Sequence, residues 1–375
     1  MDLNLTTLIN QPVLHREYGL GEIVEIEDGE FIKARFGEEI KTFTPFSIMY
    51  RHLILKDDDL MDRFTLSYAY QEKKRVDDAL KPYLKELNHM IGLKRIKSQI
   101  YDMICEINVA KLRKAFRLKE VKPTRHMVFL GNPGTGKTTV ARMLADIFKT
   151  LGVVSSGQLV EVDRSGLVAA YAGQTALKTR KAVESAIGGV LFIDEAYAIC
   201  RNDNDEYGYE ALDTLTKCLE DYRENLVVIV AGYRKEMQDF LNSNPGLSSR
   251  FKTIISFDDY SPNELNEIFL SLLKDNDYHL DKEAKKVVKE YFSSIQCLGG
   301  NGRAIRNIFE DTIRYQARRV NSLEDISIDT LSEIKACDLP FNGFDKKSNE
   351  ANDKIVNYTD NTNQGGRNHE CSSSN

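Results

Sequence analysis

The stretch GNPGTGKT, from Gly131 to Thr138, decides how the rest of this sequence is interpreted. It matches the pattern G-x-x-x-x-G-K-[ST], in which glycines let backbone N–H groups curve around phosphate groups. The apolar run MVFL, which predicts a strand, precedes it, and TTVARMLADIF, which predicts a helix, follows it. The motif in this context predicts a phosphate-binding loop whose helix N-terminus adds partial positive charge.

The residue types inside the loop predict how a nucleotide would be held. Lys137 is expected to reach the β- and γ-phosphates, and the hydroxyl of Thr138 is expected to hold Mg²⁺. We therefore predict ATP and Mg²⁺ as cofactors. The predicted nucleotide-binding residues of this segment are Gly131, Asn132, Pro133, Gly134, Thr135, Gly136, Lys137, Thr138 and Thr139.

A second motif follows in VLFIDEA, where an apolar run ends in Asp194 and Glu195. Asp194 is expected to meet the water shell of the metal, and Glu195 is expected to polarise the attacking water. Adjacent acids at the end of a strand are often only solvated. A phosphate loop upstream favours catalysis here, and the predicted reaction is ATP hydrolysis by positioning and charge stabilisation.

The pattern of apolar and polar residues divides the chain into five segments. From about residue 86, apolar runs without alternation lie between helical stretches, which is typical of a parallel sheet covered on both faces. A helical region follows, opened by a capping box at Ser261 and Glu264. The predicted segments are a small β-barrel at 1–55, a charged helical linker at 56–85, a large α/β domain at 86–258, a helical lid at 259–340 and a disordered tail at 341–375.

The N-terminal segment contains GEIVEIEDGEFIKARF, with two β-rich runs around Asp28 and Gly29 that predict a hairpin. It resembles the small SH3-like or Tudor-like barrels attached to some bacterial helicases and transcription factors. Between positions 17 and 39 the sequence has eight acidic residues, and its lysine and arginine side chains there are Lys33 and Arg35. This negative charge disfavours contact with a phosphate backbone. A protein-binding adaptor is the preferred interpretation, and a structural cap is the alternative.

Composition narrows the class of protein. The 375 residues include 51 basic and 57 acidic side chains, for a net charge of −6, which argues against a general affinity for nucleic acid. No apolar run of about 18 residues predicts a membrane-spanning helix, and no secretory signal pattern is evident at the start. The six cysteines form no Cys-x-x-Cys pair. We therefore expect a cytoplasmic protein with reduced thiols and without membrane insertion.

Several separate stretches resemble the AAA+ ATPases, and within them the group that contains stage V sporulation protein K, the red-type Rubisco activase and the ATPases of type VII secretion. The sporulation protein is the most similar of these. The resemblance runs from about residue 87 to 317 and is specific because many stretches share it. They are LNHMIGLKRIKSQI, GNPGTGKTTVARMLADIF, YAGQTALKTRKAVESAIGGVLFIDEAY, VVIVAGYRKEMQDFLNSNPGLSSRF, FDDYSPNELNEIF and NGRAIRNIFE.

The resemblance implies roles for further residues. Ile91, Gly92 and Leu93 would line the adenine pocket. Arg250 looks like an arginine finger that reaches into the site of a neighbouring subunit, which implies a closed ring. The resemblance implies that this ring is a hexamer. Arg303 is similar to the sensor-2 arginine that ties the lid to the γ-phosphate.

The resemblance also assigns a pore loop and leaves one role open. Tyr171, Ala172 and Gly173 fit the aromatic–hydrophobic–glycine loop that faces the central channel and grips a threaded peptide. A second loop, CRNDNDEYGYE, is a weaker candidate for the channel. The strand VVIVAG ends without the Asn or Thr of the sensor-1 position, and Tyr233 is the nearest polar side chain, so sensor 1 stays unassigned.

The leading functional prediction is a ring-forming ATPase that remodels or threads a protein substrate, similar to the sporulation protein. A Rubisco-activase-like remodeller is the first alternative. A switch that acts on transcription or repair machinery through the N-terminal barrel is the second. The missing sensor-1 residue motivates a third, a scaffold that does not hydrolyse ATP.

Overall fold

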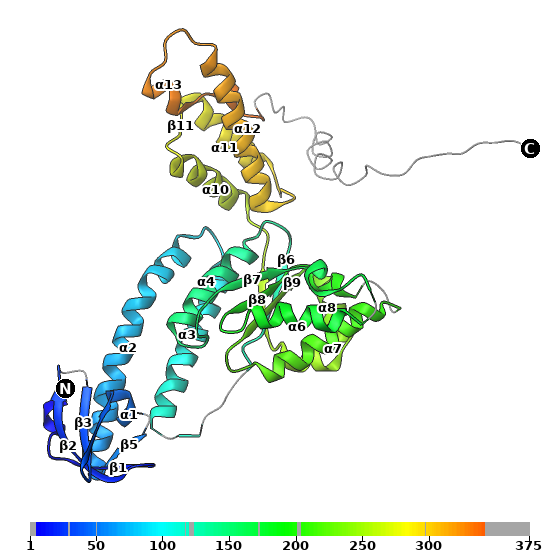
Figure 1. The fold of residues 1–375 in the computed structure, drawn as a ribbon. Helices are drawn as coiled ribbons and strands as arrows, with labels where there is room; N and C mark the ends of the chain where they lie inside the picture. Colours follow the sequence, from blue (N-terminus) through cyan, green and yellow to red (C-terminus); the bar gives the residue numbers. More distant parts are fainter. Residues whose placement is uncertain are drawn as a thin grey trace, which may run out of the picture. The chain divides into compact units, whose positions relative to one another are not determined.

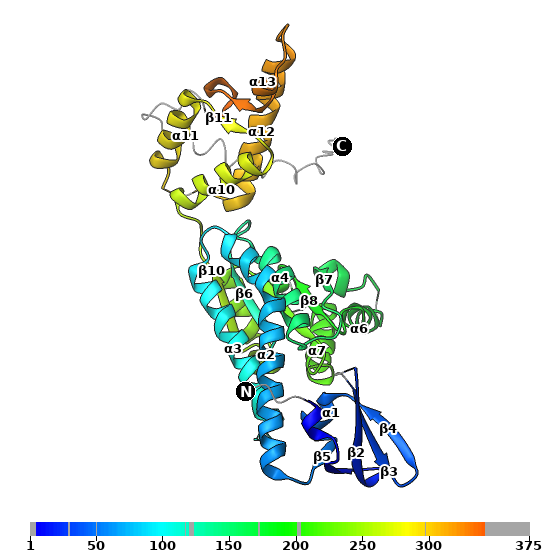
Figure 2. The same cartoon turned by 90° about the vertical axis from the view of Figure 1, so that its left-hand side faces the viewer.

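The computed structural model describes residues 5–341, apart from 29–30, 50, 117, 120–123, 172, 201–203 and 297 (Figures 1 and 2). The contacts among these residues divide the chain into two compact units. The first unit holds the residues up to Gly131 together with Lys137–Phe257, and the second holds Asn132–Gly136 together with the residues from Asp258 onward. The predicted disordered tail, from 342 on, lies outside the described residues.

The first unit begins with an antiparallel sheet, which confirms the predicted all-β character of the N-terminal segment. A short 3-10 helix, η1 (Leu5–Leu8), precedes it, and a short helix, α1 (Pro45–Met49), interrupts it before its last strand. Asp28 adopts a positive φ of 53° at the predicted turn, and Gly29 lies outside the described residues. The strands, in the order β4-β3-β2-β1-β5, are β1 (Pro12–His15), β2 (Gly19–Glu27), β3 (Phe31–Phe36), β4 (Glu39–Phe43) and β5 (Leu53–Leu55).

One face of this sheet is covered and forms a small core. Alternate strand residues such as Val13, Ile23 and Ile32 are fully buried there. Met61 and Phe64, from the helix that follows, complete the same buried cluster. The N-terminal sheet therefore depends on the next helix for part of its core.

That helix, α2 (Asp58–His89), covers the charged stretch predicted as a helical linker and continues four residues beyond it. Asp57 caps its start, because the carboxylate accepts a hydrogen bond of 2.9 Å from the Leu60 N–H. Its later residues Val76, Leu80 and Leu87 are buried in the core of the large α/β domain, and it contacts α3 (Lys94–Ala115). The first part of α2 therefore packs against the N-terminal sheet, and its later part packs in the large α/β domain.

The large α/β domain contains the predicted parallel sheet. Its strands are parallel throughout and follow the order β10-β6-β9-β8-β7. The strand that precedes the phosphate loop and the strand that ends in the acid pair are thus separated by one strand, β9. The bounds are β6 (Met127–Gly131), β7 (Leu159–Val162), β8 (Val190–Ile193), β9 (Val227–Gly232) and β10 (Thr253–Phe257).

Helices cover both faces of this sheet (Figure 1). Phe129, Phe192 and Ile229 pack with α2, α3 and α4 (Lys137–Thr150), whereas the alternate residues Val128 and Leu191 pack on the opposite face. Because both faces are buried, the strand sequences are apolar without alternation. The helices and turns that belong to this opposite side are α5 (Arg164–Leu167), α6 (Thr175–Ser185), η2 (Ala196–Ile199), α7 (Glu206–Asp221), α8 (Arg234–Asn242) and α9 (Pro245–Arg250).

The second unit contains the predicted helical lid around its own buried cluster. The predicted capping box is confirmed: the Ser261 backbone donates to the Glu264 carboxylate at 2.8 Å, and Pro262 occupies the first helical position. The elements of the lid are α10 (Pro262–Asp275), β11 (His279–Leu280), α11 (Lys282–Ser294), α12 (Asn301–Asn321), α13 (Ile328–Ser332), β12 (Glu333–Ile334) and η3 (Ala336–Asp338).

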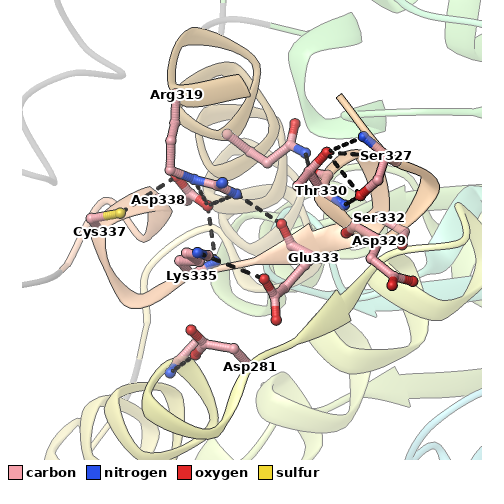
Figure 3. Close-up of polar contacts among 12 residues, drawn as sticks. Asp281, Arg319, Ser327, Asp329, Thr330, Ser332, Glu333, Lys335, Cys337 and Asp338 are labelled. Carbon is pink, nitrogen blue, oxygen red and sulfur yellow. Dashed lines mark hydrogen bonds and ion pairs between the residues drawn. The ribbon is translucent and has the colours of Figure 1, made fainter. Parts of the chain in front are cut away.

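A buried ion pair fixes the last elements of the lid (Figure 3). Arg319, on α12, donates from Nε to both carboxylate oxygens of Asp338 at 2.9 and 3.0 Å, and from Nη2 to the Glu333 carbonyl oxygen at 2.9 Å. The Asp338 side chain is only 1% exposed. Removing one partner of such a pair leaves a buried charge, which typically costs about 3–5 kcal/mol, so the pair commits β12 and η3 to this position.

No helix among the described residues combines the length and the apolar character that a membrane crossing requires.

His126, directly before β6, is a buried histidine that sequence reasoning did not single out. Its Nδ1 accepts a hydrogen bond of 3.1 Å from the Val228 N–H, and its Nε2 lies 3.1 Å from the Leu219 carbonyl oxygen. The neutral ring protonated on Nε2 therefore satisfies both contacts. Burial lowers the pKa of His126, the Leu219 carbonyl opposes that shift, and the charge of Arg250 adds to it.

Acid should therefore destabilise the first unit through His126. Above the ordinary histidine pKa of about 6.5, the ring is neutral in the folded and unfolded chain and adds no pH dependence. Below it, the unfolded chain binds a proton that the folded chain does not. The free energy of unfolding then falls by up to about 1.4 kcal/mol per pH unit until the lower folded-state pKa is reached.

Chemical denaturation between about pH 8 and about pH 5 measures this slope. His126→Gln should be less stable overall and should lose stability less steeply as the pH falls through the same range. A substitution of the exposed His52 by Gln controls for the loss of an imidazole as such. Equal slopes for the wild type and His126→Gln would contradict the prediction.

Candidate nucleotide site

The phosphate loop leaves β6 at Gly131 and enters α4 at Lys137. The ammonium of Lys137 donates a hydrogen bond of 2.8 Å to the Gly131 carbonyl oxygen, and the Thr135 hydroxyl donates one of 2.8 Å to the Asn132 carbonyl oxygen. These bonds hold the end of the loop close to the residues at which it begins. Thr138 lies in the first turn of α4, where helix N–H groups are still without intrahelical partners.

The acid pair ends the fully buried strand β8. Asp194 is half-buried and its carboxylate accepts a hydrogen bond of 3.0 Å from the backbone N–H of Glu195. Glu195 is exposed and adopts a left-handed backbone, with φ 48° and ψ 44°. A non-glycine residue in that region is strained, and such strain persists where the surrounding structure fixes the side chain for a task.

The strand order brings three strand ends to one edge. Leu130 pairs with Gly232, and Ile193 pairs with Val230, so the carboxyl ends of β6, β9 and β8 lie side by side. In open parallel sheets, ligands bind at this edge. The residues after β9 therefore lie between the phosphate loop and the acid pair, which no spacing in the sequence revealed.

The end of β9, near the predicted sensor-1 position, is closely packed. A Cβ atom at Gly232 would come within 2.8 Å of a Tyr197 ring carbon and of the Met237 sulfur, so no larger side chain fits without rearrangement. Tyr197 and Met237 fill that space, and the ring of Tyr233 lies 5.8 Å from the ring of Tyr197, centroid to centroid. The sensor-1 role stays unassigned.

Tyr197 was missed by sequence reasoning, although it closes the stretch FIDEAY directly after the acid pair. Burial, followed by the charge of Glu195, raises the pKa of Tyr197 to about 12. The hydroxyl of Tyr197 therefore keeps its proton at neutral pH and can donate a hydrogen bond beside the acid pair.

The turn between α2 and α3 carries the predicted adenine-pocket residues. Gly92 and Leu93 both have positive φ, 68° and 57°, and Ile91 and Gly92 are half-buried. Lys97 braces the turn from α3 by donating to the Met90 carbonyl oxygen at 2.6 Å. The contact with adenine stays a prediction.

The two predicted arginines lie in different units. Arg250 ends α9, is 26% exposed, donates 3.0 Å to the Gly246 carbonyl oxygen and lies 3.7 Å from the Glu220 carboxylate. Arg303 is exposed in the first turn of α12, and its guanidinium has no ion pair or side-chain hydrogen bond with any residue that the structure describes. Both side chains are thus accessible in part to a partner or ligand, and their roles stay predictions.

The predicted pore loop follows α5. Tyr171 is 72% exposed, and Gly173 has φ 74° with open space around it. Ala172 lies outside the described residues, as do residues 201–203 of the second candidate loop.

Comparison with known families identifies the large α/β domain and the helical lid. The profile "ATPase family associated with various cellular activities (AAA)" matches residues 127–259, and the "AAA lid domain" matches residues 261–351. Stage V sporulation protein K of Bacillus subtilis (strain 168) is 40% identical over 276 residues, which cover 72% of this chain and 86% of that protein. The chain belongs to the AAA family of ATPases.

Other relatives share the AAA core within different proteins. The ESX-1 secretion system protein EccA1 of Mycobacterium leprae (strain TN) is 42% identical over 270 residues, which cover 68% of this chain and 47% of EccA1. The chloroplastic ribulose bisphosphate carboxylase/oxygenase activase of Cyanidioschyzon merolae is 42% identical over 62% of this chain and 80% of that protein. The predicted group of relatives is therefore confirmed.

A solved structure supports the fold alone. The AAA domain of FIGL-1 in complex with ADP superposes with a TM-score of 0.50 at 16% identity, covering 72% of this chain and 87% of that one. Membership of this ATPase family makes the chain an ATP hydrolase, which sets aside the scaffold without hydrolysis.

The donor atoms of this AAA domain fit magnesium. The Thr138 hydroxyl and the Asp194 carboxylate are hard oxygen ligands, and Mg²⁺ in ATPases is held by one or two such groups together with substrate phosphates. These two residues would hold the ion, which would neutralise charge on the phosphates when bound.

Two substitutions should separate binding from hydrolysis. Lys137→Ala removes the cation expected at the phosphates and should weaken ATP binding at least about tenfold. Glu195→Gln keeps the size of the side chain but removes the base, and should bind ATP normally while turnover falls by about 10²–10⁴. Titration with a fluorescent ATP analogue and phosphate release measure the two effects. Normal turnover by Glu195→Gln would exclude its predicted role.

Proposed function

We propose that this chain is a ring-forming ATPase that couples ATP hydrolysis to the remodelling or threading of a protein substrate, similar to stage V sporulation protein K. The observation that carries the proposal is the exposure of Tyr171, 72%, on a loop between the phosphate loop and the acid pair. An exposed aromatic ring offers a contact that does not depend on the substrate sequence.

The hydrolytic step needs positioning more than covalent chemistry. Lys137 and the loop N–H groups bind the phosphates, and Glu195 orients the attacking water and takes its proton. Tyr197, whose hydroxyl stays protonated, donates a hydrogen bond beside this pair. Arg303, in the first turn of α12, binds the γ-phosphate from the lid.

Arg250 completes the site of the next subunit in the ring. Among the described residues, its guanidinium contacts the Gly246 carbonyl oxygen at 3.0 Å and the Glu220 carboxylate at 3.7 Å. Exchange of the long contact with Glu220 would let it engage a neighbouring nucleotide. A trans-acting arginine of this kind contributes about 10³–10⁵ to the rate in other phosphate-loop enzymes. A closed ring, most simply a hexamer, gives every site such a neighbour.

Hydrogen bonds join η2, which follows the acid pair, to α5, which precedes the Tyr171 loop. Arg164, on α5 before that loop, donates to the carbonyl oxygens of Ala198, at 3.1 Å, and Ile199 in η2, which starts directly after Glu195. The same guanidinium pairs with Asp205 at 2.6 and 3.2 Å. Displacement of η2 on hydrolysis would therefore move α5 and swing Tyr171.

The N-terminal sheet, which we interpret as an SH3-like module, selects the partner protein. Leu14 and Leu20 face each other across β1 and β2 and are 41% and 60% exposed. An exposed cross-strand apolar pair beside many carboxylates fits a protein surface better than a phosphate backbone. A switch on transcription or repair machinery remains the alternative, because such a partner would also dock here.

Mixing experiments test the ring. Arg250→Ala should lower ATP hydrolysis by at least about 10³ when it is the only subunit present. Mixed rings with the Lys137→Ala subunit, which carries an intact Arg250, should recover part of the activity. Phosphate release across a series of mixing ratios measures this. Hydrolysis at the parental rate by Arg250→Ala alone would rule out the shared site.

A trapping pull-down tests the substrate contact. Glu195→Gln with ATP should retain its client protein, which mass spectrometry identifies, and Tyr171→Ala in the same background should lose most of it. Tyr171→Phe, which keeps the ring, is the matched control and should retain the client. Client capture by Glu195→Gln/Tyr171→Ala at the Glu195→Gln level would refute the pore-loop role.

Stimulation of ATP hydrolysis by duplex DNA instead of an unfolded polypeptide would favour the alternative function, a switch on transcription or repair machinery.

A further inference from the structure

The phosphate loop and the lid touch through their backbones within the second unit. The Gly302 N–H, at the start of α12, donates a hydrogen bond of 3.0 Å to the Gly134 carbonyl oxygen. Gly134 has φ 72°, and a Cβ atom there would come within 2.2 Å of the Gly300 carbonyl oxygen and 2.8 Å of the Arg303 nitrogen. The approach is therefore closer than any side chain at position 134 allows.

Three side chains fasten this contact. The Asp259 carboxylate accepts hydrogen bonds from the Asn132 amide, with both oxygens at 2.9 Å, and from the Asn301 amide at 2.8 Å. Asn132 belongs to the phosphate loop, Asp259 to the segment before α10, and Asn301 to the first position of α12. We call these three residues the clasp. Hydrogen bonds to an ionised acceptor are roughly twice as strong as neutral ones.

Asn301 is the most constrained member of the clasp. It is 2% exposed and has φ 49°, a left-handed backbone that Asn tolerates better than most residues. Its amide oxygen accepts from the Tyr260 N–H at 3.0 Å, and its amide nitrogen also lies 3.4 Å from the Pro133 carbonyl oxygen. The clasp therefore sets where α12 begins, two residues before Arg303.

We propose that Asp259 is a positioning residue: through Asn132 and Asn301 its carboxylate holds the start of α12 against the phosphate loop, and this presents Arg303 to the phosphates that the loop binds. The inference rests on the proposed role of Arg303 and adds to it the residue that sets its position. Asp259 itself touches neither nucleotide nor water in the reaction. Nothing in the spacing of the motifs assigned it a task.

The hydrogen bonds of the clasp favour a carboxylate at position 259. Oδ1 of Asp259 accepts from both asparagines, and Oδ2 accepts from Asn132 alone. An amide with its oxygen in the place of Oδ1 keeps the bond from Asn301 but turns its NH₂ group toward the Asn132 amide nitrogen, which weakens the Asn132 arm and removes the charge from both. Asp258, the adjacent exposed carboxylate, makes no ion pair or hydrogen bond with the described residues, so it provides a control of equal charge and size.

The test compares Asp259→Asn with Asp258→Asn in the full chain. Asp259→Asn should lower kcat/KM for ATP roughly tenfold to a hundredfold, the loss expected for one charge-assisted hydrogen bond, while Asp258→Asn keeps the wild-type value. Thermal unfolding is measured on the same samples. A lower melting temperature with unchanged kcat/KM would show a merely structural role and would overturn the proposal, as would equal effects of the two variants.

A double-mutant cycle separates this inference from the function on which it rests. If Asp259 acts through Arg303, then Asp259→Asn should change kcat/KM by less than about twofold in an Arg303→Ala background. Additive losses would overturn the positioning role while leaving the role of Arg303 intact. Wild-type hydrolysis by Arg303→Ala alone would remove the role proposed for Arg303, and the inference with it.

Discussion

Parallel strands leave their carboxyl ends at one edge, and the chemistry of this ATPase depends on that constraint. β6, β9 and β8 end side by side, so the phosphate loop that follows Gly131 and the acid pair that follows Ile193 open from the same edge of the sheet. The helices on both faces keep this arrangement, because burial of every strand residue in β8 and β9 leaves no room for a shift in register. A binding site made from separate loops can then be held to the precision that phosphate transfer requires.

The same edge is closely packed where β9 ends. Tyr197 and Met237 fill the volume that a side chain larger than that of Gly232 would occupy. The ring of Tyr233 lies 5.8 Å from the ring of Tyr197, centroid to centroid. Burial, followed by the charge of Glu195, raises the pKa of Tyr197 to about 12.

The lid is organised by polar contacts that bury charge or amide groups. Arg319 and Asp338 secure its last elements (Figure 3), and Asp259 joins its first segment to the phosphate loop. In both places a carboxylate receives several N–H groups at once, which makes the contact strong and specific in direction. The loop residues Asn132–Gly136 consequently group with the lid by their contacts, although the chain connects them to the sheet on both sides.

The sequence by itself determined the features that short, contiguous patterns encode. The phosphate loop, the acid pair, the parallel α/β domain with its lid and the all-β N-terminal segment follow from glycine spacing, apolar runs and capping residues, all of which act between near neighbours. Only the tertiary structure decided that β9 lies between the two motifs, that His126 is buried and neutral, and that Asn132, Asp259 and Asn301 meet. Asp, Asn, His and Tyr are common in exposed loops, and nothing local marks the few that will be buried or brought together. The hydrogen-bond partners of His126 and Asp259 lie between 42 and 127 residues away along the chain, so only tertiary packing brings them within bonding distance.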